Sequence, residues 1–317
     1  MLAAQIAAPG QIEMQCVNIP EPGPGQVRVR LEGCGVCASN IPVWEGKPWF
    51  EYPIDPGAPG HEGWGRIDAV GAEVSGFSPG DRVAMLSGHA YAQYDIAPAT
   101  SVLKLPPEFD KAPFPGEPLG CAMNIFRRSG IRANSTVAIV GIGFLGAILT
   151  RLASEAGARV IAVSRRPDSL AFAERMGACK TACLDDENEL RELVRSATDG
   201  RQCEVVIEAT GKQRPLDLAA EFTCERGRLV IAGYHQDGPR QIDLQLWNWR
   251  GLDVINAHER DTSVYVDGMR LAIDAVQRGI LDPSPLFTHK FPLNQLGDAL
   301  NMTAQRPPGF MKAWITL

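Results

Sequence analysis

The chain has 317 residues, of which 45% are hydrophobic and 21% are charged. These proportions are typical of a globular protein of about two domains, and they exclude a fibrous or disordered chain. The formal net charge of −6 provides no basic surface for a nucleic-acid backbone, so we expect a small-molecule partner and no nucleic acid.

Residues 1–110 contain short runs of β-forming residues separated by glycine and proline. The clearest runs are residues 26–31, 65–70, 81–84 and 101–105. Frequent turns between short strands predict a barrel-like β domain.

From about residue 117 the pattern changes to alternating strands and amphipathic helices. Predicted strands cover residues 137–140, 159–163, 204–207, 228–232 and 252–256, and predicted helices between them cover residues 144–156, 169–176, 187–196 and 214–222. The strands are nearly continuous apolar runs, which is typical of a parallel, doubly wound sheet with helices on both faces. A further helix is predicted at 264–278, and the last strand, within residues 312–317, is expected to rejoin the first domain.

No segment has the pattern of a targeting peptide or a membrane span. The N-terminus lacks a basic region, and the longest apolar stretch, residues 137–150, is shorter than a membrane span and contains glycines. The eight cysteines are unevenly spaced, which fits a reduced enzyme better than a disulfide framework. We therefore expect a cytoplasmic protein without a membrane segment.

Residues 137–146 read V-A-I-V-G-I-G-F-L-G and contain a G-x-G-x-x-G motif between a predicted strand and a predicted helix. The first glycine permits a tight turn, the second lets the backbone approach a pyrophosphate, and the third lets helix and strand pack closely. A lone motif of this kind also occurs as a glycine-rich turn without a ligand, but the strand-turn-helix context favours a dinucleotide site at the helix N-terminus. The residues expected to contact the cofactor here are Gly141, Gly143, Phe144, Leu145 and Gly146.

The residues after the second strand of this domain indicate which dinucleotide binds. An acidic residue there would hold the ribose 2′-hydroxyl of NAD, but the sequence is Ser164-Arg165-Arg166. A hydroxyl and two guanidinium groups suit the 2′-phosphate of NADP(H), whereas arginines that merely begin the next helix are the alternative. We predict NADP(H), with Thr210 and Gly233 at the same carboxyl edge of the sheet.

Four separated blocks of the first domain carry residue types that bind metals. They are G-C-G-V-C-A-S-N at 33–40, P-G-H-E at 59–62, G-D-R-V at 80–83 and E-P-L at 117–119. A catalytic Zn²⁺ needs about three protein ligands and one open position, and a thiolate, an imidazole and a carboxylate from separate loops can supply them. Cys37 and His61 are the first two ligand candidates. The alternatives are a redox C-x-x-C pair with Cys34 and a buried core histidine.

These blocks, in this order and with the dinucleotide motif, resemble the zinc-dependent medium-chain dehydrogenase/reductase family, that is, the alcohol and polyol dehydrogenases. The resemblance runs from residue 20 to the final strand. It implies a GroES-like β-barrel catalytic domain at residues 1–120 and 258–317, and a Rossmann-type doubly wound domain at residues 121–257. It also implies a homodimer formed through the sheet edge near residues 252–256.

The resemblance further implies roles for individual residues. Glu62 would bind the metal directly or through water, and Glu117 would be the third protein ligand, with Cys121 one helical turn later as its rival. Ser39 would pass a proton, although a hydroxyl that only caps a local turn is the alternative. Lys312 would lie near the cofactor pyrophosphate.

The sequence departs from the family pattern in three places. The four-cysteine lobe that holds a structural zinc is missing after residues 80–83, so we expect one zinc per chain. Asn40 stands where an aspartate is usual and should orient His61 more weakly. Pro42 stands where a proton-relay histidine is often found, which excludes a relay through that position.

The sequence therefore predicts a zinc-dependent oxidoreductase that transfers hydride between NADP(H) and an alcohol/carbonyl pair. A non-catalytic NADP(H)-binding redox sensor with a decayed metal site is the alternative that Asn40 and Pro42 favour, and a zinc-free quinone-reductase-type enzyme is the one that the missing lobe favours. His258 is a candidate substrate contact. Four aromatic residues either line a site for a bulky substrate or pack in the core: Trp44, Trp49, Phe50 and Tyr52.

Overall fold

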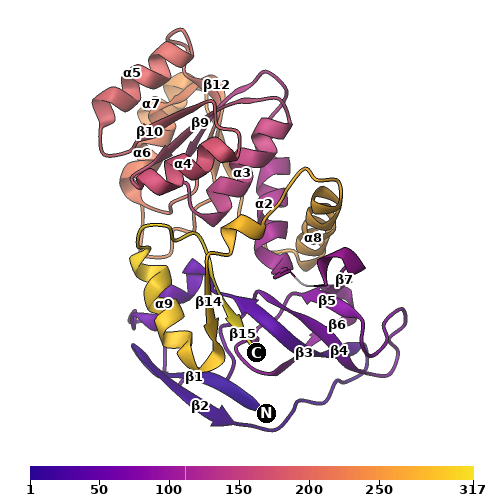
Figure 1. The fold of residues 1–317 in the computed structure, drawn as a ribbon. Coiled ribbons are helices and arrows are strands. Elements are labelled where there is room, and N and C mark those ends of the chain that lie inside the picture. The colour runs from indigo at the N-terminus through magenta and orange to yellow at the C-terminus, as the bar shows by residue number, and fades with distance from the viewer. Residues whose placement is uncertain (111) are drawn as a thin grey trace. The chain divides into compact units, whose positions relative to one another are not determined.

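The computed structural model describes residues 1–110 and 112–317. The chain divides into two compact units: residues 1–120, 261–274 and 282–317 form the first, and residues 121–260 and 275–281 form the second. Figure 1 shows the yellow C-terminal residues of the first unit beside its indigo N-terminal strands. Within the described residues, no helix has both the length and the apolar composition needed to cross a membrane.

The first unit is built on a seven-stranded sheet in the order β14-β15-β3-β4-β5-β7, with β6 also paired to β3. Its strands are β3 (Gln26–Gly35), β4 (Gly63–Val70), β5 (Arg82–Met85), β6 (Tyr94–Pro98), β7 (Val102–Lys104), β14 (His289–Pro292) and β15 (Ala313–Thr316). The prediction that the last strand rejoins the first domain is confirmed, because β15 pairs antiparallel with β3.

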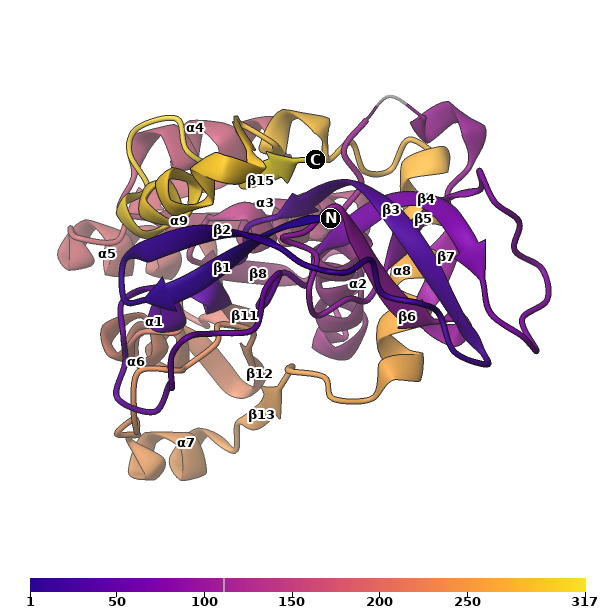
Figure 2. The same ribbon diagram turned by 90° about the horizontal axis from the view of Figure 1, so that it is seen from below.

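Smaller elements complete this unit. Strands β1 (Leu2–Ala8) and β2 (Gln11–Cys16) form an antiparallel hairpin, and α9 (Leu296–Gln305) lies against β2 (Figure 2). The remaining short helices are α1 (Ile41–Trp44), η1 (Ala38–Asn40), η2 (Ala99–Ser101), η3 (Pro107–Phe109), η4 (Ser284–Leu286) and η5 (Leu293–Gln295).

Alternation along β3 builds the core that supports the metal-binding candidates. Val27, Val29 and Leu31 are buried, whereas Arg30 between them is exposed. Each fully buried side chain of this size contributes about 1.5–3 kcal/mol to folding. The carboxyl end of β3, where the loop with Cys37 begins, is therefore anchored on a packed core.

The second unit contains a six-stranded parallel sheet in the order β10-β9-β8-β11-β12-β13. Its strands are β8 (Thr136–Val140), β9 (Arg159–Ser164), β10 (Lys180–Cys183), β11 (Cys203–Glu208), β12 (Thr223–Ile231) and β13 (Asp253–Asn256). Its helices are α3 (Phe144–Glu155), α4 (Pro167–Arg175), α5 (Glu187–Ala197), α6 (Gln213–Glu221) and α7 (Leu244–Arg250). The predicted doubly wound sheet is confirmed, and its strand order reverses between β8 and β11, where such sheets bind ligands.

Two longer helices, α2 (Gly116–Ser129) and α8 (Thr262–Gln277), each contain a boundary between the units. Residues 258–260 and 275–281, which were predicted to belong to the first domain, group with the second unit. Within that unit, the Arg151 guanidinium donates to the Ile280 carbonyl at 2.8 Å.

Candidate metal centre and dinucleotide site

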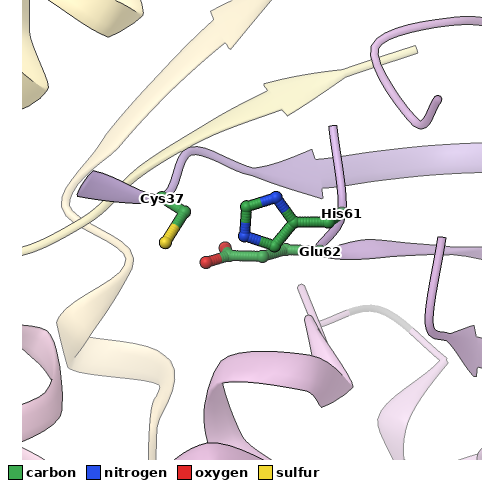
Figure 3. Close-up of side chains that lie close together, drawn as sticks. All are labelled: Cys37, His61 and Glu62. Atoms are coloured by element: carbon green, nitrogen blue, oxygen red, sulfur yellow. The ribbon is translucent and has the colours of Figure 1, made fainter. Parts of the chain in front are cut away.

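The metal-binding candidates lie on two loops of the first unit. Cys37 follows β3 at the start of η1, and His61 and Glu62 directly precede β4. Because β3 and β4 are antiparallel, with Cys34 opposite Gly63, the end of one strand meets the start of the other. The ligand atoms of the three side chains lie within 4.8 Å of one another, and Figure 3 shows the three side chains directed into one shared space.

The carboxylate of Glu62 is fully buried and only half satisfied. Lys312 donates from Nζ to Glu62 Oε1 at 2.6 Å, whereas Oε2 is buried without a hydrogen-bond partner among the described residues. A β-carbon at Gly35 would overlap this carboxylate, so the glycine makes room for it. An unpaired buried carboxylate oxygen is costly, and a metal cation would satisfy it.

The imidazole of His61 is held in one tautomer. Its Nδ1 lies 2.8 Å from the Pro59 carbonyl, so this nitrogen donates and Nε2 remains for a metal. Burial disfavours the charged ring, but a hydrogen bond with Cys37 and the charges of Cys37, Glu117 and Glu62 raise the pKa of His61 to about 10. The cluster therefore attracts positive charge, and its thiolate, imidazole and carboxylate suit Zn²⁺.

Glu117 and Cys121, the rivals for a further ligand position, fall in different units. Glu117 belongs to the first unit, and its charge contributes to the raised pKa of His61. It does not belong to the compact group of three, as far as the described residues show. Cys121 belongs to the second unit. Glu62 is thus the carboxylate in the cluster, and the ranking of Glu117 over Cys121 stays a prediction.

Asn40 does not contact His61 in the way that the sequence analysis expects. Its Nδ2 donates to the Pro59 carbonyl at 3.3 Å, the same oxygen that accepts from His61. The Tyr91 hydroxyl in turn donates to Asn40 Oδ1 at 2.8 Å, and Tyr91 is fully buried. The orienting group for the imidazole is therefore a backbone carbonyl that Asn40 and Tyr91 support. Sequence reasoning missed Tyr91, which belongs to none of the four blocks.

Lys312 pairs with the carboxylate of Glu62 within the first unit. Its side chain is 7% exposed and its ammonium pairs with Glu62. Burial opposes the charged form, but the charge of Glu62, with those of Cys37 and Glu117, raises the pKa of Lys312. Lys312 is therefore a buried counterion of the candidate metal-binding cluster in this structure. Its position near the cofactor pyrophosphate stays a prediction.

The remaining predicted residues of the first unit are Ser39 and four aromatic residues, which differ in burial. Ser39 is half-buried in η1, two residues after Cys37. Trp44 is buried in the core, and Phe50 and Tyr52 pack against it, which favours the core-packing interpretation for these three. Trp49 is 55% exposed.

The glycine-rich loop of the second unit has the geometry that its motif predicts. Gly141 has φ +106°, a conformation that favours glycine, and Gly143 is the N-cap of α3. A β-carbon at Gly146 would overlap the Gly141 carbonyl, so the third glycine permits close packing. A β-carbon at Gly141 would meet Thr210, which places the ends of β8 and β11 in contact at the point where the strand order reverses.

The two arginines after β9 differ in their surroundings. Ser164 is buried, and its hydroxyl accepts from the Arg166 backbone N–H at 3.2 Å. The Arg166 side chain donates to the Ile142 carbonyl in the glycine-rich loop at 3.4 Å, whereas Arg165 is exposed. The Arg166 side chain is therefore directed toward the glycine-rich loop, and Arg165 faces solvent.

At the carboxyl ends of β11 and β12, the structure shows a buried acidic residue that sequence reasoning missed. Glu208 ends β11 as a fully buried carboxylate and contacts His235. Tyr234 and His258 stack with ring centroids 5.5 Å apart, next to the predicted Gly233. An acidic residue at the end of an apolar strand, two residues before Thr210, was the available signal for Glu208.

Comparison with known proteins places this geometry in a family. The model of the alcohol dehydrogenase GroES-like domain matches residues 23–107, and the model of the zinc-binding dehydrogenase matches residues 145–272. The chain belongs to the zinc-type medium-chain alcohol and polyol dehydrogenase family. The predicted family, and the pairing of a GroES-like domain with a Rossmann-type domain, are confirmed.

Individual relatives cover almost the whole chain. The sorbitol dehydrogenase of Gallus gallus is 26% identical over 95% of this chain and 93% of its own length. The erythritol/L-threitol dehydrogenase of Mycolicibacterium smegmatis is 27% identical over 96% and 94%. A structure from Sinorhizobium meliloti 1021, described as a zinc-binding dehydrogenase bound to NADP, has a TM-score of 0.83 at 25% identity and covers 100% and 99% of the two chains.

Proposed function

We propose that this protein is a zinc-dependent oxidoreductase that transfers hydride between NADP(H) and an alcohol/carbonyl pair. The substrate class is a secondary alcohol, a polyol or a cyclic ketone. The observation that carries the metal is the buried cluster of Cys37, His61 and Glu62, in which one carboxylate oxygen has no partner. The sorbitol and erythritol/L-threitol dehydrogenases among the relatives support the alcohol and polyol class.

The residues of the first unit would perform the following work. Cys37, His61 and Glu62 hold the metal, with Glu117 as the expected further ligand, and the Pro59 carbonyl keeps His61 Nε2 free for it. When bound, Zn²⁺ supplies the Lewis acidity that polarises a carbonyl oxygen or stabilises an alkoxide. Ser39 passes the proton between the substrate oxygen and water. Its route to solvent does not use position 42, because proline has no side-chain donor or acceptor.

The residues of the second unit would bind the nicotinamide cofactor, which donates or accepts the hydride. The glycine-rich loop at the N-terminus of α3 receives the pyrophosphate. Ser164, Arg165 and Arg166 receive the 2′-phosphate of NADP(H), with Arg166 already directed toward the loop. The NADP-bound structure among the relatives supports this choice.

We also propose a homodimer through the free edge of the second unit. Strand β13 is the edge strand of the sheet, and α7, which precedes it, lies at the same margin of the unit (Figure 2). This margin carries large exposed apolar side chains, with Trp249 88% exposed and Leu244 57% exposed. Apolar side chains beside an unpaired strand edge are typical of a surface that a second copy covers.

Metal content and turnover, measured together, test the function. Purified protein should contain about one zinc per chain and should change the absorbance of the nicotinamide with at least one member of a panel of alcohols or carbonyls. Cys37→Ala should lose both zinc and turnover while it still binds NADPH, because the two sites lie in different units. Full activity without metal would contradict the zinc mechanism. NADPH binding without turnover on any panel member would favour the redox-sensor alternative.

A further inference from the structure

The buried carboxylate of Glu208 links two loops at the carboxyl edge of the parallel sheet. Its Oε1 accepts hydrogen bonds from the backbone N–H groups of Thr210 at 2.6 Å and Gly211 at 2.9 Å, and from the Thr210 hydroxyl. Its backbone carbonyl accepts from the N–H groups of Ala232 and Gly233, both at 2.8 Å. Glu208 thus contacts the loop after β11 through its side chain and the loop after β12 through its backbone.

The second carboxylate oxygen is held by a histidine whose tautomer is fixed. His235 Nε2 lies 3.0 Å from Glu208 Oε2, and Arg240 Nε lies 2.8 Å from His235 Nδ1. Because a guanidinium can only donate, Nδ1 accepts and Nε2 carries the hydrogen that Glu208 receives. Arg240 also donates from Nη2 to the Gly211 carbonyl at 2.7 Å. We call Glu208, His235 and Arg240 the carboxylate clamp.

The clamp lies where the two loops touch through their backbones. Gly211 has φ +72°, and a β-carbon there would overlap the carbonyl of Tyr234. A β-carbon at Gly233 would overlap both the Gly211 nitrogen and the Glu208 carboxylate. Neither loop can therefore shift without disturbing the other or the clamp.

The strand order indicates which part of a dinucleotide would lie over this region. The residues expected to bind the adenosine 2′-phosphate follow β9, and the pyrophosphate loop follows β8. Beyond β8 the sheet continues with β11 and β12, and dinucleotides lie across the point where the strand order reverses. The nicotinamide half therefore lies over the ends of β11 and β12, which the clamp holds.

We propose that Glu208, His235 and Arg240 are positioning residues for the nicotinamide half of the cofactor. This inference rests on the proposed function. The clamp keeps the loops at residues 210–211 and 233–235 in the bound conformation before the cofactor arrives, so binding does not have to order them. A chain without the clamp binds the adenosine end as before but binds the nicotinamide end more weakly.

Two ligands separate the halves of the site in the zinc-loaded protein. Dissociation constants are measured by calorimetry for NADPH and for adenosine 2′,5′-bisphosphate, which lacks the nicotinamide half. In His235→Phe and Arg240→Gln, NADPH binding should weaken by roughly 10-fold, the size expected when a hydrogen bond to a charged group is lost. Binding of adenosine 2′,5′-bisphosphate should stay within about twofold of wild type.

Two further variants serve as controls. His235→Gln keeps an amide N–H for Glu208 and an amide oxygen for Arg240, so it should retain most of the NADPH affinity. Lys212→Ala removes an ion pair between the loop after β11 and Asp237 on the loop after β12. The lysine side chain is largely exposed, so this pair should contribute little. If His235→Phe does not fold, Arg240→Gln carries the test alone, because its partly exposed side chain tolerates a polar replacement.

Each outcome is decisive. Folded His235→Phe or Arg240→Gln protein with wild-type NADPH affinity would overturn the clamp and leave the proposed function intact. An equal loss for both ligands would show a general weakening of the unit and would also overturn it. Wild-type protein that binds neither ligand would instead overturn the proposed function, and the inference with it.

Discussion

Replacement of Tyr91 by phenylalanine tests how His61, the proposed metal ligand, is oriented. The Tyr91 hydroxyl donates to Asn40 Oδ1 at 2.8 Å, and Asn40 Nδ2 donates to the Pro59 carbonyl that accepts from His61. Burial, followed by the charges of Cys34, Glu62 and Cys37, raises the pKa of Tyr91 well above its usual value. The hydroxyl is therefore protonated and donating throughout the neutral range.

The expected effect has two parts. Tyr91→Phe leaves the buried Asn40 amide oxygen without this donor, which costs about 1–3 kcal/mol of unfolding free energy. Loss of a group that directly orients a metal ligand typically weakens metal binding by roughly 10–100-fold. Tyr91 acts one hydrogen bond further away, through Asn40 and the Pro59 carbonyl, so we expect zinc binding to weaken by about fivefold, below that range.

Zinc affinity is measured by competition with a chromophoric chelator at fixed pH, and thermal unfolding is followed with and without zinc. Tyr94→Phe is the matched control, since Tyr94 lies in β6 of the same unit, against Arg28. Asn40→Ala should weaken zinc binding at least as much, and the double variant with Tyr91→Phe should lose less than the sum of the two effects, because both act through one carbonyl. A folded Tyr91→Phe protein with wild-type zinc affinity would refute this account, and additive losses would show that the two residues act separately.

Three further predictions concern the ligands, the cofactor and the assembly. Glu117→Gln should lower zinc affinity or activity by roughly 10-fold and Cys121→Ser should matter less, as measured by metal analysis and initial rates; the reverse ranking would exchange the two roles. Wild type should prefer NADPH over NADH by about tenfold or more in kcat/KM. Ser164→Asp combined with Arg165→Ala should reverse that preference, because the new carboxylate repels a 2′-phosphate and accepts a hydrogen bond from a 2′-hydroxyl. Equal kcat/KM of wild type with both cofactors would contradict the assignment. Trp249→Ser should shift the protein from dimer to monomer in analytical ultracentrifugation, because it removes an 88% exposed indole from the proposed interface; an unchanged dimer would exclude Trp249 from that interface.

Much of the fold follows from local sequence pattern. The apolar strands of the second unit and the helices between them were predictable because a parallel sheet buried on both faces requires continuous apolar runs. Strand β10 was missed, since among its four residues only Ala182 is buried. Helix α7 was missed because it is only seven residues long and buries no residue fully; only Leu246 and Trp247 pack against the core, which is too few to form a clear apolar stripe.

The candidate site was predictable where its residues are close in sequence. Cys37, His61 and Glu62 stand in short blocks, and β3 and β4 bring these blocks together by simple antiparallel pairing. The pairing of Glu62 with Lys312 joins residues 250 positions apart, and no local pattern indicates it. The same holds for Tyr91, whose importance depends on the two groups that it supports and not on its neighbours in sequence.

Glu62 and Glu208 differ in how many hydrogen-bond partners their carboxylate oxygens have, and this difference indicates different roles. Both Glu62 and Glu208 are fully buried, and a buried carboxylate is stable only when its oxygens have partners. In Glu208 both oxygens receive donors from the chain itself, so nothing is left for a ligand and the group can only hold the loops around it. In Glu62 one oxygen is paired with Lys312, and the other has no partner among the described residues. The Glu62 carboxylate lies next to the Cys37 thiol and the His61 imidazole. We therefore propose that the incomplete carboxylate of Glu62 binds the metal, and that the complete carboxylate of Glu208 positions the cofactor loops.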